Sequence, residues 1–233
     1  MRLTTILQSC CKLLVALALL FLEASDRSSA AETGSGTIHS PYVWNFDTLP
    51  VGTLPKDFVI GTLFDGRPAG DWRILEADAA KSPTHVLGQI MGKGAEHAYK
   101  VVLIDGTNAS DLDLQVSFLP IAGKADMGGG LIWRAADDWN YYLTRANPLE
   151  QNIRIYKVVK GIRHMLKNFD QTIDSKKWHT LHVITRGCQI QVLYDEKAVL
   201  DLCDQTFITG RIGLWTKSDA VTYFDDLRLV ITH

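Results

Sequence analysis

The sequence lacks an excess of charge of either sign. Its 233 residues include 24 lysines and arginines and 26 aspartates and glutamates, so the formal net charge is −2. Neither a strongly basic nucleic-acid-binding surface nor an acidic disordered tail is therefore expected. With 18 glycines and 7 prolines, the composition is not that of a low-complexity chain, and a hydrophobic content of 46% is ample for a folded core.

The apolar run near the start is too short to cross a membrane. Leu13–Leu22 has ten apolar residues, whereas a spanning helix needs about 20. Arg2 and Lys12 precede this run, and a polar stretch ending in small residues at 29–31 follows it. This arrangement is typical of a secretory signal peptide. We predict a signal peptide over residues 1–31 and a mature chain over 32–233, secreted or periplasmic and without a transmembrane span. An uncleaved anchor is the alternative.

Cysteine is scarce, with four residues in the whole chain. Cys10 and Cys11 lie before the apolar run and would be removed with the signal peptide. Cys188 and Cys203 would then remain in an oxidising compartment, where a pair of cysteines usually forms a disulfide. We expect this disulfide to be structural.

The segment between these two cysteines predicts a β-hairpin. With a two-residue turn at Asp195–Glu196, Cys188 falls opposite Cys203, so that a cross-strand disulfide needs little adjustment of the backbone. The same register places Asp201 on the apolar face. A slip of one residue would bury Leu200 instead but would separate the cysteines, and both registers stay open.

Helical periodicity is missing from the mature chain, which reads as one strand after another. Short alternating or β-rich runs are separated by Gly, Pro, Asp and Ser clusters at the spacing of an all-β sandwich or barrel. No repeat, linker or charge block marks a second domain. The predicted strands are 43–46, 72–76, 86–91, 99–104, 112–118, 130–134, 140–145, 153–158, 162–167, 178–184, 189–192, 211–216 and 221–230.

Four strings in this order resemble a known family. They are GGGLIWRAADDWNYYLTRAN at 128–147, IRIYKVVKGIRHML at 153–166, KKWHTLHVITRGCQIQVLYDEKAVLDLCD at 176–204 and GRIGLWTKSDAVTYFDDLRLV at 210–230. The chain resembles the concanavalin A-like jelly roll and is most similar to laminin-G-like domains and to the 3-keto-disaccharide hydrolases of secreted bacterial proteins. The resemblance implies one jelly-roll β-sandwich of two antiparallel sheets over residues 32–233. This fold hosts lectins, hydrolases and adhesion modules, so it does not select an activity.

Aromatic and hydrogen-bonding side chains gather in the middle of the chain in a pattern suited to a sugar. Aromatic rings stack on sugar faces, while Arg, Asp and Asn bond to hydroxyls. Arg163 could extend the same face. The alternative is that the aromatic residues belong to the core and the charged ones to ion pairs at sheet edges. The candidate ligand-binding residues are Arg134, Asp138, Trp139, Asn140, Tyr142, Arg145, Arg154 and Tyr156.

Catalysis on a glycoside has weaker support in the sequence. Jelly-roll glucanases carry alternating acids on one strand, and the nearest string here, Glu76–Lys81, has lysine where the final acid belongs. The resemblance to the 3-keto-disaccharide hydrolases still implies an enzyme, with Asp138, Glu150 or His164 as acid/base candidates. We therefore expect a secreted, lectin-like carbohydrate-binding domain that uses its concave sheet. A glycoside-acting enzyme and a non-catalytic adhesion module are the alternatives, with a glycan or glycoside as the expected partner.

Metal-ligand spacing is poor. Asp105, Asn108, Asp225 and Asp226 could offer oxygen ligands to Ca²⁺, but they form no contiguous loop. The alternative for Asp225 and Asp226 is that they cap a turn. The sequence therefore predicts either no cofactor or calcium.

Overall fold

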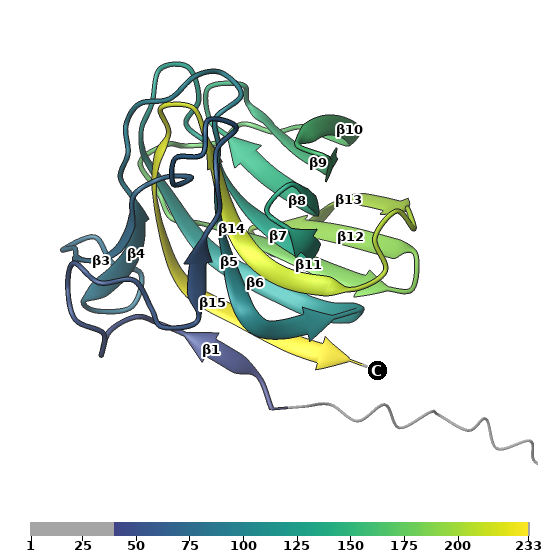
Figure 1. Ribbon diagram of the computed structural model, residues 1–233, viewed down its shortest axis with the longest axis horizontal. Helices are drawn as coiled ribbons and strands as arrows, with labels where there is room; N and C mark the ends of the chain where they lie inside the picture. The colour runs from purple at the N-terminus through teal and green to yellow at the C-terminus, as the bar shows by residue number, and fades with distance from the viewer. Residues whose placement is uncertain (1–39, 233) are drawn as a thin grey trace, which may run out of the picture. The chain divides into compact units, whose positions relative to one another are not determined.

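A computed structural model describes residues 40–232, and these form fifteen β-strands (Figure 1). The described residues all belong to one compact unit. The predicted signal peptide lies outside the described residues. Within the described part of the chain, no helix is long and apolar enough to cross a membrane.

The fifteen strands are divided between two sheets. Their bounds are β1 (Tyr42–Trp44), β2 (Phe58–Ile60), β3 (Trp72–Glu76), β4 (His85–Gln89), β5 (Tyr99–Ala109), β6 (Asp111–Ala122), β7 (Gly129–Asp137), β8 (Asn140–Asn147), β9 (Asn152–Val159), β10 (Ile162–Asp170), β11 (His179–Arg186), β12 (Gln189–Tyr194), β13 (Lys197–Cys203), β14 (Gly210–Lys217) and β15 (Val221–Thr232).

The two sheets are antiparallel throughout. The eight-stranded sheet has the order β13-β12-β11-β6-β15-β4-β3, with β1 paired to β15, and the seven-stranded sheet has the order β10-β9-β8-β7-β14-β5-β2. The prediction of an all-β sandwich of two antiparallel sheets is confirmed. The strand β2 was not predicted, because it is only three residues long and lies in an irregular stretch.

The main core lies between the sheets and follows from strand alternation. In β6, every second residue from Leu112 to Phe118 is fully buried and faces the second sheet. Leu131 and Trp133 of β7 meet these residues from the other side. Because side chains alternate between the two faces of a strand, each apolar residue of β6 is followed by one that points away from the core.

The hairpin of β12 and β13 carries the predicted disulfide. Cys188 and Cys203 are bonded, with their Cα atoms 4.8 Å apart. Tyr194 pairs with Lys197 across the expected two-residue turn. Both turn residues, Asp195–Glu196, have positive φ, at 46° and 67°. This is the type I′ geometry that matches the twist of two antiparallel strands.

A β-bulge gives this hairpin the slipped register at the cysteines, where Cys203 pairs with Gln189 and not with Cys188, and the expected separation of the cysteines is wrong because they are bonded. Val192 pairs with Leu200, and the register shifts before Leu193, so that Val199 is the extra residue. Leu200 is thereby buried, at 3% exposure, while Asp201 faces solvent. A bulge places two residues opposite one, so the expected turn is kept while the rest of the hairpin buries Leu200, and the cysteines are still close enough to bond.

A second apolar cluster covers the other side of the seven-stranded sheet, which we call the outer face. The segment Gly61–Ala69 crosses part of this face. Gly61 donates its N–H to the carbonyl of Val101 at 2.9 Å, and Phe64 meets Trp139 edge to face with ring centroids 4.3 Å apart. The members of the cluster are Val101, Leu103, Ile132, Ala135, Tyr141, Leu143, Tyr156, Val158 and Trp215.

Candidate functional site

Three neighbouring strands bring several predicted ligand-binding residues onto the outer face. Arg145 of β8 pairs directly with Arg154 of β9, and Leu143 of β8 pairs with Tyr156 of β9. Residues that pair across strands, and residues two apart along a strand, share a face. The five residues Arg145, Glu150, Arg154, Tyr156 and Arg163 are called the outer-face cluster below.

Glu150 joins two arginines of the cluster. Its Oε2 accepts a hydrogen bond from Arg145 at 2.8 Å and another from Arg154 at 2.7 Å. The hydroxyl of Tyr156 lies 3.3 Å from each of the two guanidinium groups. Arg145 is fully buried, whereas the side chain of Arg154 is 27% exposed and that of Glu150 is 37% exposed. The cluster therefore has a buried floor and an accessible rim.

The charge of this group determines how Glu150 ionises. Partial burial raises the pKa of the Glu150 carboxyl. The positive charges of Arg145 and Arg154, together with hydrogen bonds, lower this pKa by more than burial raises it, so the net shift is downward. Charges of opposite sign at hydrogen-bond distance favour the ionised form of a carboxyl. Glu150 is thus held as a carboxylate, a state that accepts hydrogen bonds and does not supply a proton.

Arg163 lies over the aromatic part of the outer face. Its guanidinium carbon is 4.3 Å from the centre of the Tyr156 ring, 5.5 Å from that of Tyr99 and 5.7 Å from that of Trp215. A guanidinium at these distances from aromatic rings makes cation–π interactions, which restrict the side chain. The half-buried Arg163 and Tyr99 thus form a mixed polar and aromatic surface over the two buried rings.

The predicted candidates in the turn between β7 and β8 serve mainly to hold neighbouring loops. Asp138 Oδ2 accepts the backbone N–H of Thr62 at 2.5 Å, and Asn140 Oδ1 accepts that of Lys160 at 2.9 Å. Trp139 is half-buried against Phe64. Their remaining exposed surface borders the outer face at the opposite end of β8 from Glu150.

Arg134 and Tyr142 lie away from the outer face. Arg134 has a φ of 47° in a bulge of β7, is 1% exposed, and donates to carbonyls of Ser110 and Gly187, both at 2.7 Å. Tyr142 packs in the main core with its ring 5.5 Å from that of Trp133. The donors of Arg134 are used inside the protein, and Tyr142 is fully buried.

The three acid/base candidates do not come together. Asp138 precedes β8 and Glu150 follows it, and eight residues of strand at about 3.3 Å each separate their ends by more than 20 Å. The two carboxyls that cleave a glycosidic bond are usually about 5 to 9.5 Å apart. His164 pairs with Lys157, one position out of phase with Arg163, so it points to the other face of β10.

The four predicted calcium ligands lie on two sheets. Asp105 and Asn108 belong to β5, and Asp105 pairs with Arg211 at 2.7 Å. Asp225 is buried in β15 and accepts the backbone N–H groups of Lys81 and Ser82, both at 3.0 Å. Between residues 40 and 232, no three His, Cys, Asp or Glu side chains are grouped to hold a metal ion. Calcium binding stays a prediction from sequence.

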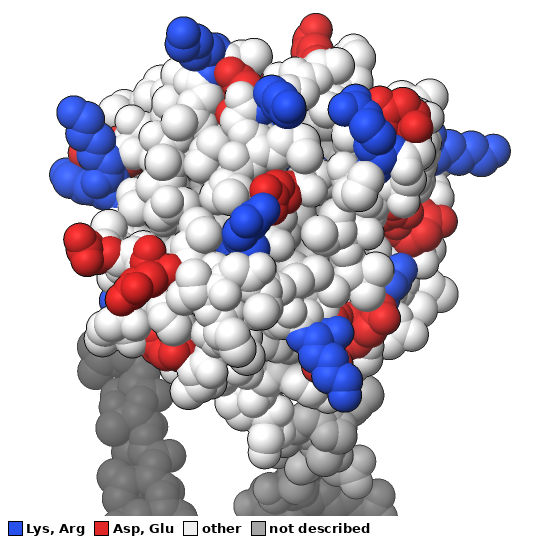
Figure 2. All heavy atoms as spheres, turned by 60° about the vertical axis from the view of Figure 1, so that its left-hand side comes forward, with Lys and Arg blue, Asp and Glu red and all other residues white. Residues whose placement is uncertain are grey.

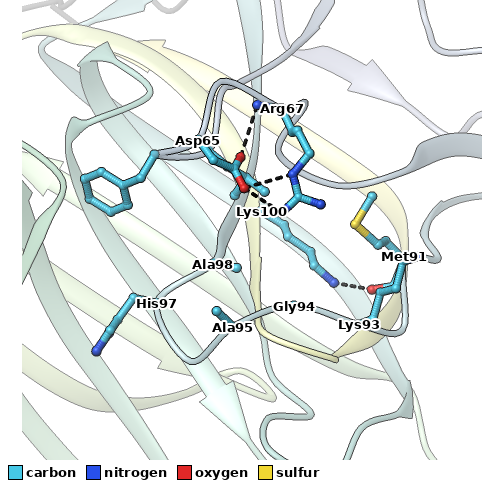
Figure 3. A pocket seen from close by; sticks show the side chains of 11 residues that line it. Asp65, Arg67, Met91, Lys93, Gly94, Ala95, His97, Ala98 and Lys100 are labelled. Atoms are coloured by element: carbon cyan, nitrogen blue, oxygen red, sulfur yellow. Dashed lines mark hydrogen bonds and ion pairs between the residues drawn. The ribbon is translucent and has the colours of Figure 1, made fainter.

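A hollow of about 530 Å³ opens between the loop after β2 and the loop before β5 (Figure 3). Apolar side chains dominate its wall, among them Leu63, Phe64 and Met91. Lys100 runs through its floor and donates from Nζ to the carbonyl of Met91. Burial lowers the pKa of Lys100 to about 8. Sequence reasoning missed this site, although a lysine inside the apolar run 99–104 was a visible signal.

The exposed charges are dispersed. Figure 2 shows basic side chains spread over one face of the molecule, several of them beside acidic ones, and a small group of acidic side chains at its lower left. On this face the distribution agrees with the small net charge of the sequence.

Comparison with known proteins supports the fold. The chain is similar to the carbohydrate-binding module CBM66 from Bacillus subtilis, with 18% identity, a TM-score of 0.59, and coverage of 74% of this chain and 94% of the module. It is also similar to SCLam, a non-specific endo-β-1,3(4)-glucanase from family GH16, with 11% identity, a TM-score of 0.54, and coverage of 86% and 92%.

A third solved structure is also similar in fold to this chain. The Crh5 transglycosylase in complex with NAG is 9% identical, with a TM-score of 0.55 and coverage of 83% of this chain and 84% of that one. No protein-family model and no curated protein sequence matches the chain. At these identities the similarities establish the fold alone, and the described part of the chain is a jelly-roll β-sandwich.

Proposed function

We propose that this protein is a secreted, lectin-like carbohydrate-binding protein whose ligand lies on the outer face of the seven-stranded sheet. The observation that carries the proposal is the outer-face cluster, in which Glu150 joins Arg145 and Arg154 beside the ring of Tyr156. The fold is similar to that of a carbohydrate-binding module, which is consistent with this function but does not select it.

The chemistry of the cluster suits a sugar. Guanidinium groups donate several hydrogen bonds in one plane, and a carboxylate accepts them, so together they can satisfy neighbouring hydroxyls of a pyranose or furanose ring. The half-buried Tyr99, beside Arg163, borders the cluster with aromatic surface on which a sugar face could pack. The fully buried Arg145 holds Glu150 in position from below.

Binding is favoured over hydrolysis because the cluster holds one ionised carboxylate, with no acid/base partner among the predicted candidates. Glu150 is held in its charged form by two arginines, and Asp138 is at the far end of β8. An acid that donates a proton to a leaving group needs a raised pKa, whereas that of Glu150 is lowered. This arrangement is better suited to holding a glycan than to cleaving one.

A glycan array tests the proposal directly. We expect the wild-type protein to bind at least one class of oligosaccharide and Arg154→Ala to lose roughly tenfold in affinity, as removal of a charge-assisted hydrogen bond predicts. Arg73→Ala is the matched control, because Arg73 also pairs with a carboxylate, Asp71, but on the eight-stranded sheet. Absence of glycan binding, or equal losses in both variants, would contradict the proposal.

A glycoside-acting enzyme of the 3-keto-disaccharide hydrolase type is the second candidate. The four sequence strings resemble both laminin-G-like domains and these hydrolases, and the resemblance to the hydrolases favours this candidate. Incubation with 3-keto-glucosides measures this activity, and Asp138→Asn and His164→Ala test the residues the resemblance implies. Turnover that survives both substitutions would remove these two residues from the mechanism. A protein that neither turns over these substrates nor binds glycans would fit an adhesion module.

Export is part of the proposal. The disulfide between Cys188 and Cys203 is consistent with an oxidising compartment. Mass determination of the protein recovered from the medium or the periplasm should give a chain that begins near residue 32. Recovery of the full-length chain in the membrane fraction would favour an uncleaved anchor.

A further inference from the structure

Arg163 differs from every other arginine between residues 40 and 232 in having no carboxylate or carbonyl partner. The other arginines donate to protein oxygens or lie in ion pairs. Arg163 makes neither contact, and its Nη1 is buried without a hydrogen-bond partner. Buried donors are nearly always paired in folded proteins, so a group left without an acceptor needs an explanation.

Other buried donors on this face are out of a ligand's reach. The Nε of Arg145 is also buried without a partner, but the side chain of Arg145 has no exposed surface. The indole N–H of Trp215, below Arg163, is likewise fully buried and lies beside the hydroxyl of Tyr141. The half-buried Arg163 is therefore the donor among these three that a ligand on the outer face can reach.

The balance of charge leads in the same direction. Arg145 and Arg154 share the carboxylate of Glu150, and each has a further acidic neighbour, Asp126 for Arg145 and Asp170 for Arg154. Arg163, in contrast, forms no ion pair with a described residue, so its positive charge is left without a counter-ion. An anionic ligand would therefore be attracted to this face specifically.

We infer that the outer face binds an acidic saccharide, and that Arg163 pairs with a sugar carboxylate. This inference rests on the proposed carbohydrate binding and specifies its ligand class. A planar guanidinium matches a planar carboxylate through two parallel hydrogen bonds, and the rings of Tyr99, Tyr156 and Trp215 restrict the side chain before the ligand arrives. The arginine–glutamate group beside it is left for the hydroxyls of the same residue or of its neighbour.

The test compares three sets of oligosaccharides that differ at one group. The first set contains the tetramers of galacturonic acid, of glucuronic acid, of mannuronic acid and of guluronic acid. The second contains the same tetramers with each carboxyl reduced to an alcohol. The third contains these reduced tetramers with sulfate groups added. Affinities are measured by calorimetry on the mature chain and on the variants Arg163→Gln, Arg163→Lys and Arg73→Gln.

We expect at least one uronate tetramer to bind and its reduced and sulfated counterparts to bind at least about tenfold more weakly. Arg163→Gln should lose roughly tenfold to a hundredfold in affinity, Arg163→Lys should lose less, and Arg73→Gln should match the wild type. If Arg163→Gln does not fold, as judged by circular dichroism, the carboxyl-reduced ligands and Arg163→Lys decide the question.

Other outcomes separate this inference from the function on which it rests. Preferential binding of neutral or reduced tetramers, equal binding of sulfated ones, or undiminished uronate binding by folded Arg163→Gln would overturn the carboxylate site and leave carbohydrate binding intact. Failure to bind any saccharide would overturn both.

Discussion

The carboxylate of Glu150 lies 2.8 Å from the guanidinium of Arg145, a side chain with no exposed surface. Arg145 also donates to Asn152 Oδ1 at 2.5 Å, so it has two anchors inside the protein. Glu150, in contrast, is partly exposed and comes from the turn between β8 and β9. One surface carboxylate therefore neutralises a buried cation.

Replacing Glu150 by glutamine should destabilise the protein. The substitution keeps the shape but leaves the buried charge of Arg145 without its counter-ion, which we expect to cost about 2 kcal/mol in the free energy of unfolding. Urea unfolding at neutral pH measures this change. Asp71→Asn is the control, because its partner Arg73 is 42% exposed and such pairs contribute about 1 kcal/mol or less. Equal effects of the two substitutions would contradict the prediction.

The turn between β9 and β10 should not tolerate a side chain at Gly161. Its φ is +77°, and a Cβ atom there would lie 2.7 Å from ring atoms of both Phe64 and Trp139. Gly161→Ala should thus combine backbone strain with a steric clash. Gly187→Ala isolates the strain, because Gly187 has a φ of +55° and no atom within 4 Å of a Cβ. We expect Gly161→Ala to cost at least about 1 kcal/mol more than Gly187→Ala, measured by thermal unfolding.

The disulfide should contribute to stability by restricting the unfolded chain. Cys188 and Cys203 are separated by 15 positions, and closing a loop of that length is expected to stabilise the folded state by about 3 kcal/mol. The double variant Cys188→Ser, Cys203→Ser should lose this amount in urea unfolding. Reduced wild-type protein should behave like the double variant. A loss below about 0.5 kcal/mol in both samples would argue against this role.

Asp225 should make stability depend on pH. Burial first, and then the charge of Asp226, raise the pKa of Asp225 to about 6, although backbone N–H groups act in the opposite direction. Because the pKa is raised in the folded state, the stabilising contribution of the protonated carboxyl is complete below about pH 3.8 and is lost as the pH rises through about 6.

Comparison with Asp225→Asn isolates this effect. The loss should approach about 3 kcal/mol, the equivalent of a pKa difference between 3.8 and about 6. Between pH 4 and 8, the unfolding free energy of the wild type should therefore fall by about that amount relative to the variant. A constant difference between the two proteins across this range would show that Asp225 keeps its ordinary pKa.

The hairpin of β12 and β13 shows where local pattern reaches its limit. Alternation predicted both strands and the turn, and cysteine count predicted the disulfide. The choice between the two registers could not be made locally, because a bulge at Val199 keeps the expected turn while Leu200 is buried and Cys203 pairs with Gln189. A bulge is selected by how the whole strand fits against the core, which strand periodicity does not encode.

The site shows the same limit over longer distances. Placing Arg145, Arg154 and Tyr156 on one face follows from strand pairing, and these residues were predicted together. Arg134 was grouped with them, but a bulge in β7 brings its donors to Ser110 and to other carbonyls remote in sequence.

Amino-acid pattern was sufficient for the all-β class, for the two-sheet sandwich through the family resemblance, and for the disulfide, because alternation and cysteine pairing follow from neighbouring residues. Only the tertiary structure determined that Asp138 lies far from Glu150, that Arg134 is buried and that Arg163 has no partner. Each of these depends on contacts between residues distant in sequence. The small net charge of the sequence therefore does not reveal that one arginine, Arg163, lies over aromatic rings without a counter-ion where the strands meet on the outer face.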